Sequence, residues 1–420
     1  MSQKERPRAE ILTVGDELLK GSTLNGNARF LGRALTELGF RVSGQTACPD
    51  EHGLLRSRLR EAMERSQVLI VTGGLGPTPD DLTRDAIAAH FGVPLKESKK
   101  QLSRIRKFYK DRGRKIPEIV YREAQYPANG VPLDNACGMA LGFMIDTDNC
   151  IIAVLPGVPR EMEAMFCEGV KPRLEKRYPK LAPKYSAVLK TVGLSEPDVM
   201  KRLGRDFFRD RFDFGIYPSP SETAVRVQAD SSSVLKRLEA LARKRLQGNL
   251  YALEDRSLAE TVGEHLKKRR FSLALAESCT AGLLASEIAS CPGASDYFLG
   301  GIVSYSNASK ERELDVPGSL LKSCGAVSQE AALSMASNVR RKFRSDFGIS
   351  LTGVAGPGGG TKLKPVGLVW IAVAGPRGER AEKFLFSGAR NLIRLRAVKK
   401  ALELLWRELV PSANHRGHDA

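Results

Sequence analysis

A serine and a lysine in the last third of this 420-residue chain have the clearest chemical potential. Ser278 lies in ESCTAG, directly after the apolar run FSLALA. A hydroxyl at such a strand-to-helix turn can act as a nucleophile, and amides at the helix start can receive an oxyanion. A nucleophilic serine also needs a base. The histidines of this third are His265, in a basic helix, and His415 and His418 near the end, so a Ser-His-Asp triad is not expected.

Lys310 and Tyr305 offer a different base, in the motif SYSNASK that follows the apolar residues GGIV. A partly desolvated lysine loses its proton more easily than one in water. Each residue also has a structural interpretation: Ser278 as a helix N-cap, Lys310 as a solvated lysine and Tyr305 as an aromatic packed at an edge. Cys279 is a second candidate nucleophile, because a helix N-terminus lowers a thiol pKa; otherwise it is a small buried side chain.

Two glycine-rich loops follow apolar strands and suit phosphate groups. TGVAGPGGG (352–360) offers many backbone donors, and its alternative is a flexible linker. GGLGPTPDDLTRD (73–85) opens a predicted helix, where glycines and free amides let an anion approach. It is neither a Walker A loop nor a GxGxxG fingerprint. LPGVPRE (155–161) forms either a second wall of the same pocket or a plain turn.

Carboxylates stand beside this second loop. Asp80, Asp81 and Asp85 lie within it, and Asp16 and Glu17 form an earlier acidic turn. Hard oxygen ligands next to phosphate favour a divalent cation such as magnesium. In the alternative, Asp80 only caps the helix and Asp81 complements its dipole.

The segments around these motifs alternate between apolar runs and helical patterns. In the first part we predict strands at 9–14, 40–47, 67–71 and 151–155, and helices over 25–38, 53–65 and from about Asp80. In the last part we predict strands at 271–276, 300–306, 348–352 and 366–374, and helices over 257–269, from Ser278, from Gln329 and over 389–409. Between them, about two strands (186–193, 222–229) and two helices (196–204, 233–247) form a small α+β module. This pattern predicts an α/β protein with two doubly wound domains joined by that module.

Composition suggests where these domains meet. The proline- and lysine-rich stretch KRYPKLAPKY marks a boundary, so we expect domains at 1–175, 176–255 and 256–410, then a disordered tail at 411–420. The net charge of +18 divides unevenly, as +3 in 1–175, +6 in 176–255 and +9 in 256–420. A basic chain suits anionic partners. Aromatic residues are only 6% and do not interleave with the basic runs, so nucleic acid is not the expected partner.

Cysteine usage and hydropathy indicate the compartment. The seven cysteines are widely spaced and contain no CxxC pair, which argues against a disulfide framework and fits a reducing cytoplasm. No run of eighteen apolar residues occurs, and the first residues lack the apolar core of a signal peptide, so no membrane partner is expected.

The motifs together resemble the CinA family over nearly the whole chain. GDELLKG with NGNA (15–28), TGGLGPTPDDLTRD and LPGVPREM look like its N-terminal domain, which is similar to the molybdopterin-binding fold. ESCTAG, FLGGIVSYSNASK, GAVS and TGVAGPGGGTKLKPVG look like its C-terminal domain. The resemblance implies metal-dependent ADP-ribose pyrophosphatase activity for the first domain and nicotinamide mononucleotide deamidation for the second. The central module looks like the family's KH-type linker, but it has no clear GXXG clamp and RNA binding is not inferred.

The resemblance also implies roles for single residues. Ser278 would attack the carboxamide carbon with Lys310 and Tyr305 activating it, ammonia would leave, and water would release nicotinate mononucleotide. This step needs no cofactor, whereas the N-terminal site would use a divalent metal held by Asp16, Asp80 and Asp81. The expected substrate-binding residues lie in the loops described above: Thr280, Ala281, Gly282, Thr352, Gly353, Gly356, Gly358, Gly74, Gly76, Thr78 and Asn25.

One residue departs from the family pattern. Ala281 stands where the family usually has glycine, which matters if that position needs a positive φ. The resemblance further implies a cytoplasmic homodimer with small-molecule nucleotides as partners. Two rival functions stay open: a pterin- or nucleotide-binding protein without N-terminal catalysis, and a nucleic-acid-associated competence factor, which steeply salt-dependent DNA binding would support.

Overall fold

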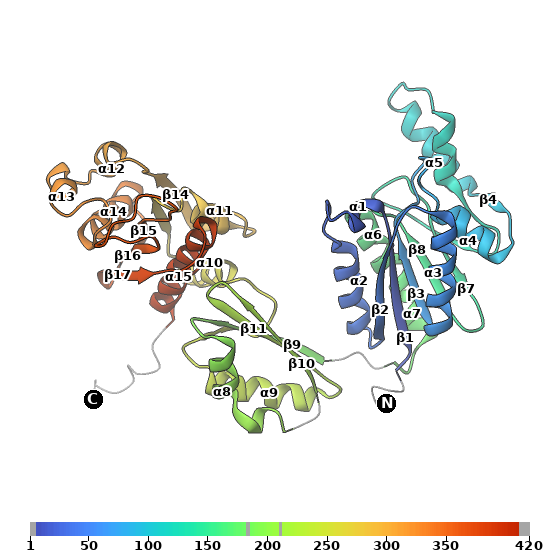
Figure 1. The fold of residues 1–420 in the computed structure, drawn as a ribbon, viewed down its shortest axis with the longest axis horizontal. Coiled ribbons are helices and arrows are strands. Elements are labelled where there is room, and N and C mark those ends of the chain that lie inside the picture. Colours follow the sequence, from blue (N-terminus) through green and yellow to red (C-terminus); the bar gives the residue numbers. More distant parts are fainter. Residues whose placement is uncertain (1–5, 182–184, 210–211, 411–420) are drawn as a thin grey trace. The chain divides into compact units, whose positions relative to one another are not determined.

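The computed structural model describes residues 6–181, 185–209 and 212–410, so the predicted tail at 411–420 lies outside the described residues. Contacts divide the chain into two compact units, residues 1–185 and residues 186–420 (Figure 1). The first unit therefore ends within the proline- and lysine-rich stretch. The second unit contains both the predicted central module and the predicted C-terminal domain.

The N-terminal unit is built on a six-stranded sheet in the order β2-β1-β3-β8-β7-β6. The first four strands in this order are parallel and the last two are antiparallel. Their bounds in chain order are β1 Arg8–Val14, β2 Arg41–Cys48, β3 Val68–Thr72, β6 Val131–Leu133, β7 Gly142–Asp146 and β8 Ile151–Leu155. Every residue of β3 and β8 is buried, as their continuous apolar runs predict.

Helices cover both faces of this sheet. One apolar cluster packs α2 (Gly26–Glu37), α6 (Pro159–Met165) and α7 (Lys171–Arg177) on one face. A second cluster packs α3 (His52–Arg65) and α4 (Thr83–Phe91) on the other. The doubly wound α/β class is thus confirmed for this unit, with two antiparallel strands added at one edge. Asn25 caps α2 by accepting from the Ala28 amide, as predicted.

Smaller elements complete the unit. They are α1 (Asp16–Leu19), the strand pair β4 (Leu95–Glu97) and β5 (Gln125–Pro127), α5 (Lys99–Lys110), the 3-10 helix η2 (Glu118–Ala124) and the short π-helix η3 (Phe166–Val170). The helix predicted to start near Asp80 begins at Thr83 instead. The residues before it form a turn, because the Asp81 carboxylate accepts hydrogen bonds from Thr78.

The second unit begins with a four-stranded sheet in the order β10-β11-β9-β12, which is packed against two helices. The bounds are β9 Tyr185–Val192, α8 Glu196–Phe207, β10 Asp213–Ser219, β11 Glu222–Ala229, α9 Ser232–Arg245 and β12 Leu250–Ala252. The prediction of about two strands was too low. β10 is an edge strand that carries glycine and proline, and β12 has only three residues, so neither shows a clear apolar pattern.

The rest of the second unit is a five-stranded sheet in the order β14-β13-β15-β16-β17. β14, β13 and β15 are parallel, and β16 and β17 are antiparallel. Their bounds are β13 Leu273–Glu277, β14 Phe298–Val303, β15 Phe347–Gly353, β16 Leu368–Gly375 and β17 Gly378–Leu385. β17 was not predicted, because it is mostly exposed and rich in charged residues.

Helices again cover both faces. α10 (Leu258–Arg269), α11 (Leu283–Ala289) and α15 (Arg390–Leu409) pack on one face, while α12 (Asn307–Leu314), α13 (Gly318–Ser323) and α14 (Gln329–Phe343) pack on the other. A 3-10 turn, η4 (Ala294–Asp296), precedes β14. The helix predicted from Ser278 begins at Leu283, five residues later. The intervening residues therefore form a loop at the carboxyl end of β13, where ligands bind in α/β sheets.

Within residues 6–181, 185–209 and 212–410, no helix is both long and apolar enough to cross a membrane.

Candidate active site

Ser278 and Lys310 lie against each other at the carboxyl edge of the five-stranded sheet. Ser278 follows β13, and its amide donates to the carbonyl of Leu351 on the neighbouring strand β15. Lys310 sits on α12, which follows β14, the strand on the other side of β13. The Lys310 Nζ lies 2.9 Å from Ser278 Oγ and 2.6 Å from the carbonyl oxygen of Ser304. Because parallel strands end at one edge, residues 32 positions apart meet there.

The amine of Lys310 is buried without an opposite charge. The residue is 1% exposed and Ser278 is 8% exposed. Among the described residues, the hydrogen-bond partners of Nζ are the Ser278 hydroxyl and the Ser304 carbonyl, and neither is a carboxylate. Burial therefore lowers the pKa of Lys310 from 10.5 to about 8. A substantial share of this amine is neutral near physiological pH, which allows it to accept a proton from Ser278.

Glu277 fixes the loop that carries the nucleophile. Its carboxylate is 1% exposed and accepts from the amides of Gly282, Leu284 and Ala285 at 2.8 to 3.1 Å. A buried carboxylate thus satisfies the first turn of α11, which Ser278 was expected to cap. The hydroxyl of Ser278 is left free for Lys310. The sequence prediction missed this role, although Glu277 directly precedes Ser278 in the motif ESCTAG.

Ala281 and Gly282 both have positive φ. The values are 51° for Ala281 and 89° for Gly282, so the loop needs two consecutive left-handed residues. Ala281, which stands where the family usually has glycine, therefore occupies a position that requires a positive φ. Alanine adopts this conformation at a cost of about 1–2 kcal/mol relative to its favoured region. The Glu277 hydrogen bonds are formed with this alanine in place.

Cys279 and Thr280 face the core. Cys279 is 5% exposed, and burial raises the pKa of its thiol to about 11. A thiolate at this position is thus disfavoured, which argues against Cys279 as the nucleophile. Thr280 is fully buried, and its hydroxyl has no hydrogen-bond partner within the described residues. The backbone amides of both residues likewise lack an acceptor in the described part of the chain.

Tyr305 does not join the Ser278–Lys310 pair. Its side chain is 59% exposed, and its hydroxyl accepts a hydrogen bond from Arg390 at 2.7 Å. No hydrogen bond links this hydroxyl to Ser278 or Lys310 in the described structure. The exposed position after β14 turns the ring outward, toward the start of α15. Tyr305 is thus placed at the mouth of the site rather than beside the nucleophile.

Two arginines of α15 complete this edge, and the sequence prediction missed both. Arg390 donates to the carbonyl of Gly356 at 2.6 Å as well as to Tyr305, and Arg394 donates to the carbonyl of Thr280 at 2.7 Å. Neither is paired with a carboxylate within the described residues, and Arg394 Nε is buried without a partner. Their four-residue spacing on a helix places them on one face, which was the available signal.

The glycine-rich loop after β15 contributes through its backbone. Gly353 pairs with β16, where a Cβ would lie 2.5 Å from the Leu368 carbonyl oxygen. Gly356 has a φ of 76° and its carbonyl holds Arg390, whereas Gly358 faces open space. The buried Thr352 hydroxyl donates to the Ala326 carbonyl at 2.7 Å. The Thr352 hydroxyl therefore stabilises the fold. The expectation that it binds a ligand is not supported by this hydrogen bond.

The N-terminal loop is arranged differently. Asp81 accepts from both the amide and the hydroxyl of Thr78, at 2.9 and 2.5 Å. Gly74 has a φ of 64°, and a Cβ there would lie 2.3 Å from Thr83 Oγ1. A Cβ on Gly76 would lie 2.4 Å from Asp81 Oδ2. These glycines thus make room for the loop's own side chains.

Asn25 and Asn27 connect this loop region to α2. Asn25 donates to Thr13 Oγ1 in addition to capping the helix, so it is engaged within the fold. Asn27 donates to Thr72 Oγ1 and to the carbonyl of Gly157, and its own Oδ1 is buried without a partner in the described structure. The segment LPGVPRE thus lies beside the end of β3, as expected for a second wall. Asn27 was not singled out from the sequence.

The carboxylates predicted to hold a metal are not arranged as a set of ligands in the described structure. Asp16 forms an ion pair with Lys20 at 2.7 Å, which lowers the pKa of Asp16, and Asp81 is engaged with Thr78. Asp80 is exposed. Within the described residues no group of three or more histidine, cysteine or acidic side chains is arranged to hold a metal ion. The residues as placed thus show no ready-made metal-binding set, and the metal-ligand roles of Asp16, Asp80 and Asp81 stay a prediction.

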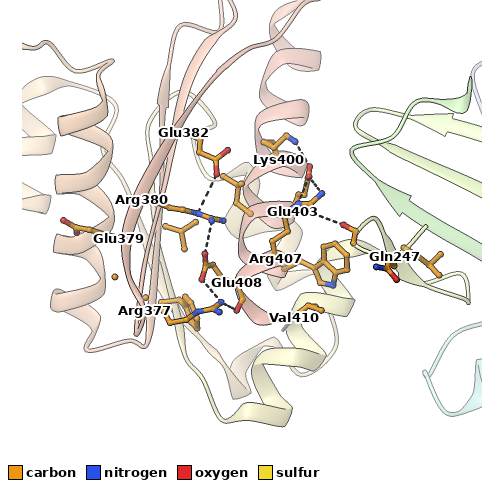
Figure 2. Close-up of a pocket in the computed structure, with 18 of the residues that line it drawn as sticks. Gln247, Arg377, Glu379, Arg380, Glu382, Lys400, Glu403, Arg407, Glu408 and Val410 are labelled. Atoms are coloured by element: carbon orange, nitrogen blue, oxygen red, sulfur yellow. Dashed lines mark hydrogen bonds and ion pairs between the residues drawn. The ribbon is translucent and has the colours of Figure 1, made fainter. Parts of the chain in front are cut away.

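A separate cavity of about 990 Å³ lies at the opposite end of the five-stranded sheet (Figure 2). It is lined by the amino end of β15 at Phe347, which pairs with Leu273, whereas Ser278 follows the carboxyl end of β13. Figure 2 shows its charged side chains in pairs, with Arg377 and Arg380 on Glu408 and with Arg407 on Glu403. The cavity therefore lies at the other end of the sheet from Ser278 and is distinct from the candidate active site.

Comparisons with known proteins agree with this architecture. Residues 255–409 match the model described as "CinA C-terminal domain", and residues 10–176 match the "Probable molybdopterin binding domain". A "Putative competence-damage inducible protein" of Desulforudis audaxviator is 38% identical over 407 residues, covering 95% of this chain and 98% of that protein. A "CinA-like protein" of Kosmotoga olearia is 37% identical over 411 residues, covering 96% and 99%.

Solved structures of similar proteins cover part of the chain. A crystal structure of "the protein CinA with unknown function" from Thermoplasma acidophilum is 34% identical, with a TM-score of 0.38, and covers 40% of this chain and 98% of that chain. The full-length sequence matches extend over both units. The chain therefore belongs to the CinA family.

Proposed function

We propose that the site around Ser278 hydrolyses the carboxamide of nicotinamide mononucleotide to nicotinate mononucleotide and ammonia. The observation that carries this proposal is the 2.9 Å contact between Ser278 Oγ and a buried lysine whose pKa is lowered to about 8. A hydroxyl beside a neutral amine is an activated nucleophile for acyl transfer. The printed names of the relatives do not state this activity.

In the first half of the reaction, Ser278 Oγ attacks the carboxamide carbon while Lys310 Nζ takes its proton. The carbonyl oxygen becomes an oxyanion, which the amides of Cys279 and Thr280 are free to receive. The C–N bond then breaks, Lys310 returns the proton to the leaving nitrogen, and ammonia departs. The product is a nicotinoyl ester on Ser278.

In the second half, water attacks the ester carbon while Lys310 again takes a proton. The C–O bond to Ser278 breaks, and the proton on Nζ returns to Oγ. The acid leaves as nicotinate mononucleotide. The Ser304 carbonyl, 2.6 Å from Nζ, holds the amine in place through both halves.

The nucleotide phosphate would bind at Arg390 and Arg394. Within the described residues, their hydrogen bonds go to carbonyl, amide and hydroxyl oxygens, so their charge is not neutralised by a carboxylate. The glycine loop at 353–360 lies beside Arg390 through the Gly356 carbonyl. Arginine is well suited to phosphate because its planar fork donates two parallel hydrogen bonds.

Ammonia release from nicotinamide mononucleotide by the purified protein tests this proposal. We expect turnover by the parent and a loss of about 10³-fold or more in Ser278→Ala, with Ser323→Ala on α13 as a matched exposed control. Unchanged rates in Ser278→Ala would rule out the nucleophile. Absence of turnover in the parent would rule out this substrate.

For the N-terminal unit, we propose binding of a nucleotide or a pterin at the end of β3. The observation in favour is the buried, unpartnered Oδ1 of Asn27 beside the left-handed glycines 73 and 74. Burial and the neighbouring carboxylates of Asp16, Glu17 and Asp80 raise the pKa of Asp50, so several acidic side chains gather at this edge. ADP-ribose hydrolysis stays a prediction here, because the described carboxylates do not form a metal-binding set.

Calorimetry with ADP-ribose, with and without magnesium, separates binding from hydrolysis. Binding without release of AMP would support the binding-only function, and metal-dependent release that is lost in Asp80→Asn would support hydrolysis. Deamidation should be unchanged in that variant, because Asp80 belongs to the other unit.

A further inference from the structure

The most uneven charge in the molecule lies in one segment of the N-terminal unit. Residues 96–115 contain ten basic and two acidic residues. The remainder of residues 1–175 contains 16 basic and 21 acidic residues. The net charge of +3 in residues 1–175 is therefore the sum of a strongly basic segment and an acidic remainder. We call α5 and the turn that follows it, residues 99–115, the basic arm (Figure 1).

The apolar side of the basic arm is already used by the fold. Gln101 and Ile105 are buried, and Ile105 packs with Val120 and Ala124 in a small apolar cluster. The ring of Phe108 is covered by the guanidinium of Arg112, whose carbon lies 3.6 Å from the ring centroid. What the arm presents outward is therefore polar and charged.

Most exposed basic side chains of the basic arm have no acidic partner within the described residues. Within the described residues, six exposed basic side chains of the arm have neither a hydrogen bond nor an ion pair: Lys99, Arg106, Lys107, Lys110, Arg114 and Lys115. The other three are engaged, since Lys100 pairs with Asp134, Arg104 donates to the Gly138 carbonyl and Arg112 donates to the Phe108 carbonyl. Asp111 is the acidic residue within the arm.

Four of the six cations form a stripe along α5. Lys99, Arg106 and Lys110 are separated by seven and four residues, so they share one face of the helix, and Lys107 lies beside them. At 1.5 Å per residue, the stripe from Lys99 to Lys110 is about 16 Å long. A duplex carries about one negative charge per 1.7 Å of its axis, so several phosphates lie within reach of such a stripe.

We propose that the basic arm binds the phosphate backbone of double-stranded nucleic acid without reading its bases. A membrane surface is disfavoured, because an interfacial helix needs an apolar face and that of α5 is buried in the protein. A single strand is disfavoured, because base stacking needs free aromatic faces: Arg112 lies over the ring of Phe108, which is 36% exposed, and Tyr109 is half-buried. An acidic protein partner is disfavoured because the stripe lacks the apolar centre typical of protein interfaces. This differs from the expectation drawn from the sequence, where the charges were not localised.

The test compares the full-length protein with two charge-matched triple variants. In the arm variant, Arg106, Lys107 and Lys110 are each changed to Gln, which keeps helix propensity. In the control, Arg60, Lys171 and Lys176 of the same unit, which are exposed and unpaired within the described residues, are changed to Gln. Binding to a labelled duplex of about 30 base pairs is followed by anisotropy from about 50 to 200 mM salt.

We expect the arm variant to bind about tenfold more weakly or worse, and its log–log salt slope to be smaller by about 2.7, or 0.9 for each lost contact. The control should stay within about threefold of the parent. Equal weakening in both variants, or no duplex binding by the parent at low salt, would overturn the proposal. So would arm-dependent binding to phosphatidylserine vesicles without binding to the duplex. Unchanged melting temperatures and deamidation rates in both variants exclude a folding defect.

Discussion

Two loops of this protein each follow the carboxyl end of a parallel strand, but their polar side chains are used differently. One loop leaves its polar side chains available, and the other hydrogen-bonds them within the loop. In the C-terminal part, residues 278–282 follow β13, and Glu277 satisfies the amides of the next helix. Ser278 and Lys310 are then free to face each other. In the N-terminal unit, the loop after β3 turns its polar groups on itself, with Asp81 holding Thr78. A reactive pair arises where a neighbouring residue takes over the structural hydrogen bonds.

Two buried lysines of the second unit show the same contrast in electrostatic terms. Lys310 has hydrogen-bond acceptors without negative charge, and burial lowers its pKa to about 8. Lys399 is also largely buried, but Glu222 and Glu287 lie 3.3 and 2.6 Å from its Nζ. Burial alone would lower the pKa of Lys399, but the two carboxylates have a larger opposite effect. The pKa of Lys399 is therefore raised. A lysine base thus requires burial without a carboxylate partner.

The largest expected effect is on catalysis by Lys310→Ala. We expect deamidation to fall by about 10³-fold or more, because Ser278 loses its proton acceptor. In the parent, activity should rise with pH as Lys310 loses its proton near pH 8 and level off above that. A pH–rate profile of kcat/KM measures this limb. A flat profile from about pH 6 to 9 would contradict the base assignment.

The next effect concerns the phosphate. Arg394→Gln should raise KM for nicotinamide mononucleotide by about 10- to 100-fold with a smaller change in kcat, because one charge-assisted contact is lost. Arg396→Gln is the matched control on the same helix, since Arg396 is bonded to Ser387 instead. Nicotinamide riboside, which lacks the phosphate, should not distinguish the parent from Arg394→Gln. If KM responds equally in both variants, the phosphate lies elsewhere.

Stability should change in opposite directions at the two buried lysines. Lys310→Met should stabilise the fold at pH 7 by about 1–2 kcal/mol, because it removes a buried amine that has no counter-charge. Since the folded-state pKa lies below the unfolded value of 10.5, this gain is present below pH 8 and disappears as the pH rises toward 10.5. Lys399→Met should destabilise by about 2–3 kcal/mol, because it leaves Glu222 and Glu287 unpaired. Urea unfolding at pH 7 and pH 10 measures the free energy of unfolding of both variants. If both variants were stabilised, or both destabilised, at pH 7, the contrast between the two lysines would be contradicted.

The smallest effect is expected for the loop backbone. Ala281→Gly should stabilise the protein by about 1 kcal/mol or less, because glycine adopts a φ of 51° without the Cβ penalty but loses more chain entropy on folding. Deamidation should be retained. Thermal unfolding measures the shift, and Ala285→Gly in α11 is a control expected to destabilise. A loss of stability in Ala281→Gly would mean that the methyl group packs favourably.

Local sequence determined most of the strands and helices. The apolar runs of β3, β8 and β13 and the capping residue Asn25 are short-range signals, because hydrophobic periodicity and capping involve neighbouring residues. The same local signals placed Ser278 after a strand and Lys310 in the next motif. They failed for β4, β5, β6, β10, β12 and β17, which are edge strands or strands of only three residues. They also failed for β7, which is buried inside its sheet but whose five residues were not singled out from the sequence.

The tertiary structure decided which polar groups are left to act. Strand order brings β14 beside β13, so Lys310 reaches Ser278 and loses its solvent, and this depends on contacts between distant segments. The same non-local packing brings Arg394 to Thr280 across 114 residues and turns Tyr305 away. The pairs Asp16–Lys20 and Asp81–Thr78, by contrast, join residues four and three positions apart, so they are local contacts. Residue types can be read along the chain, but the burial and pairing that set their charge and reactivity exist only in the folded state.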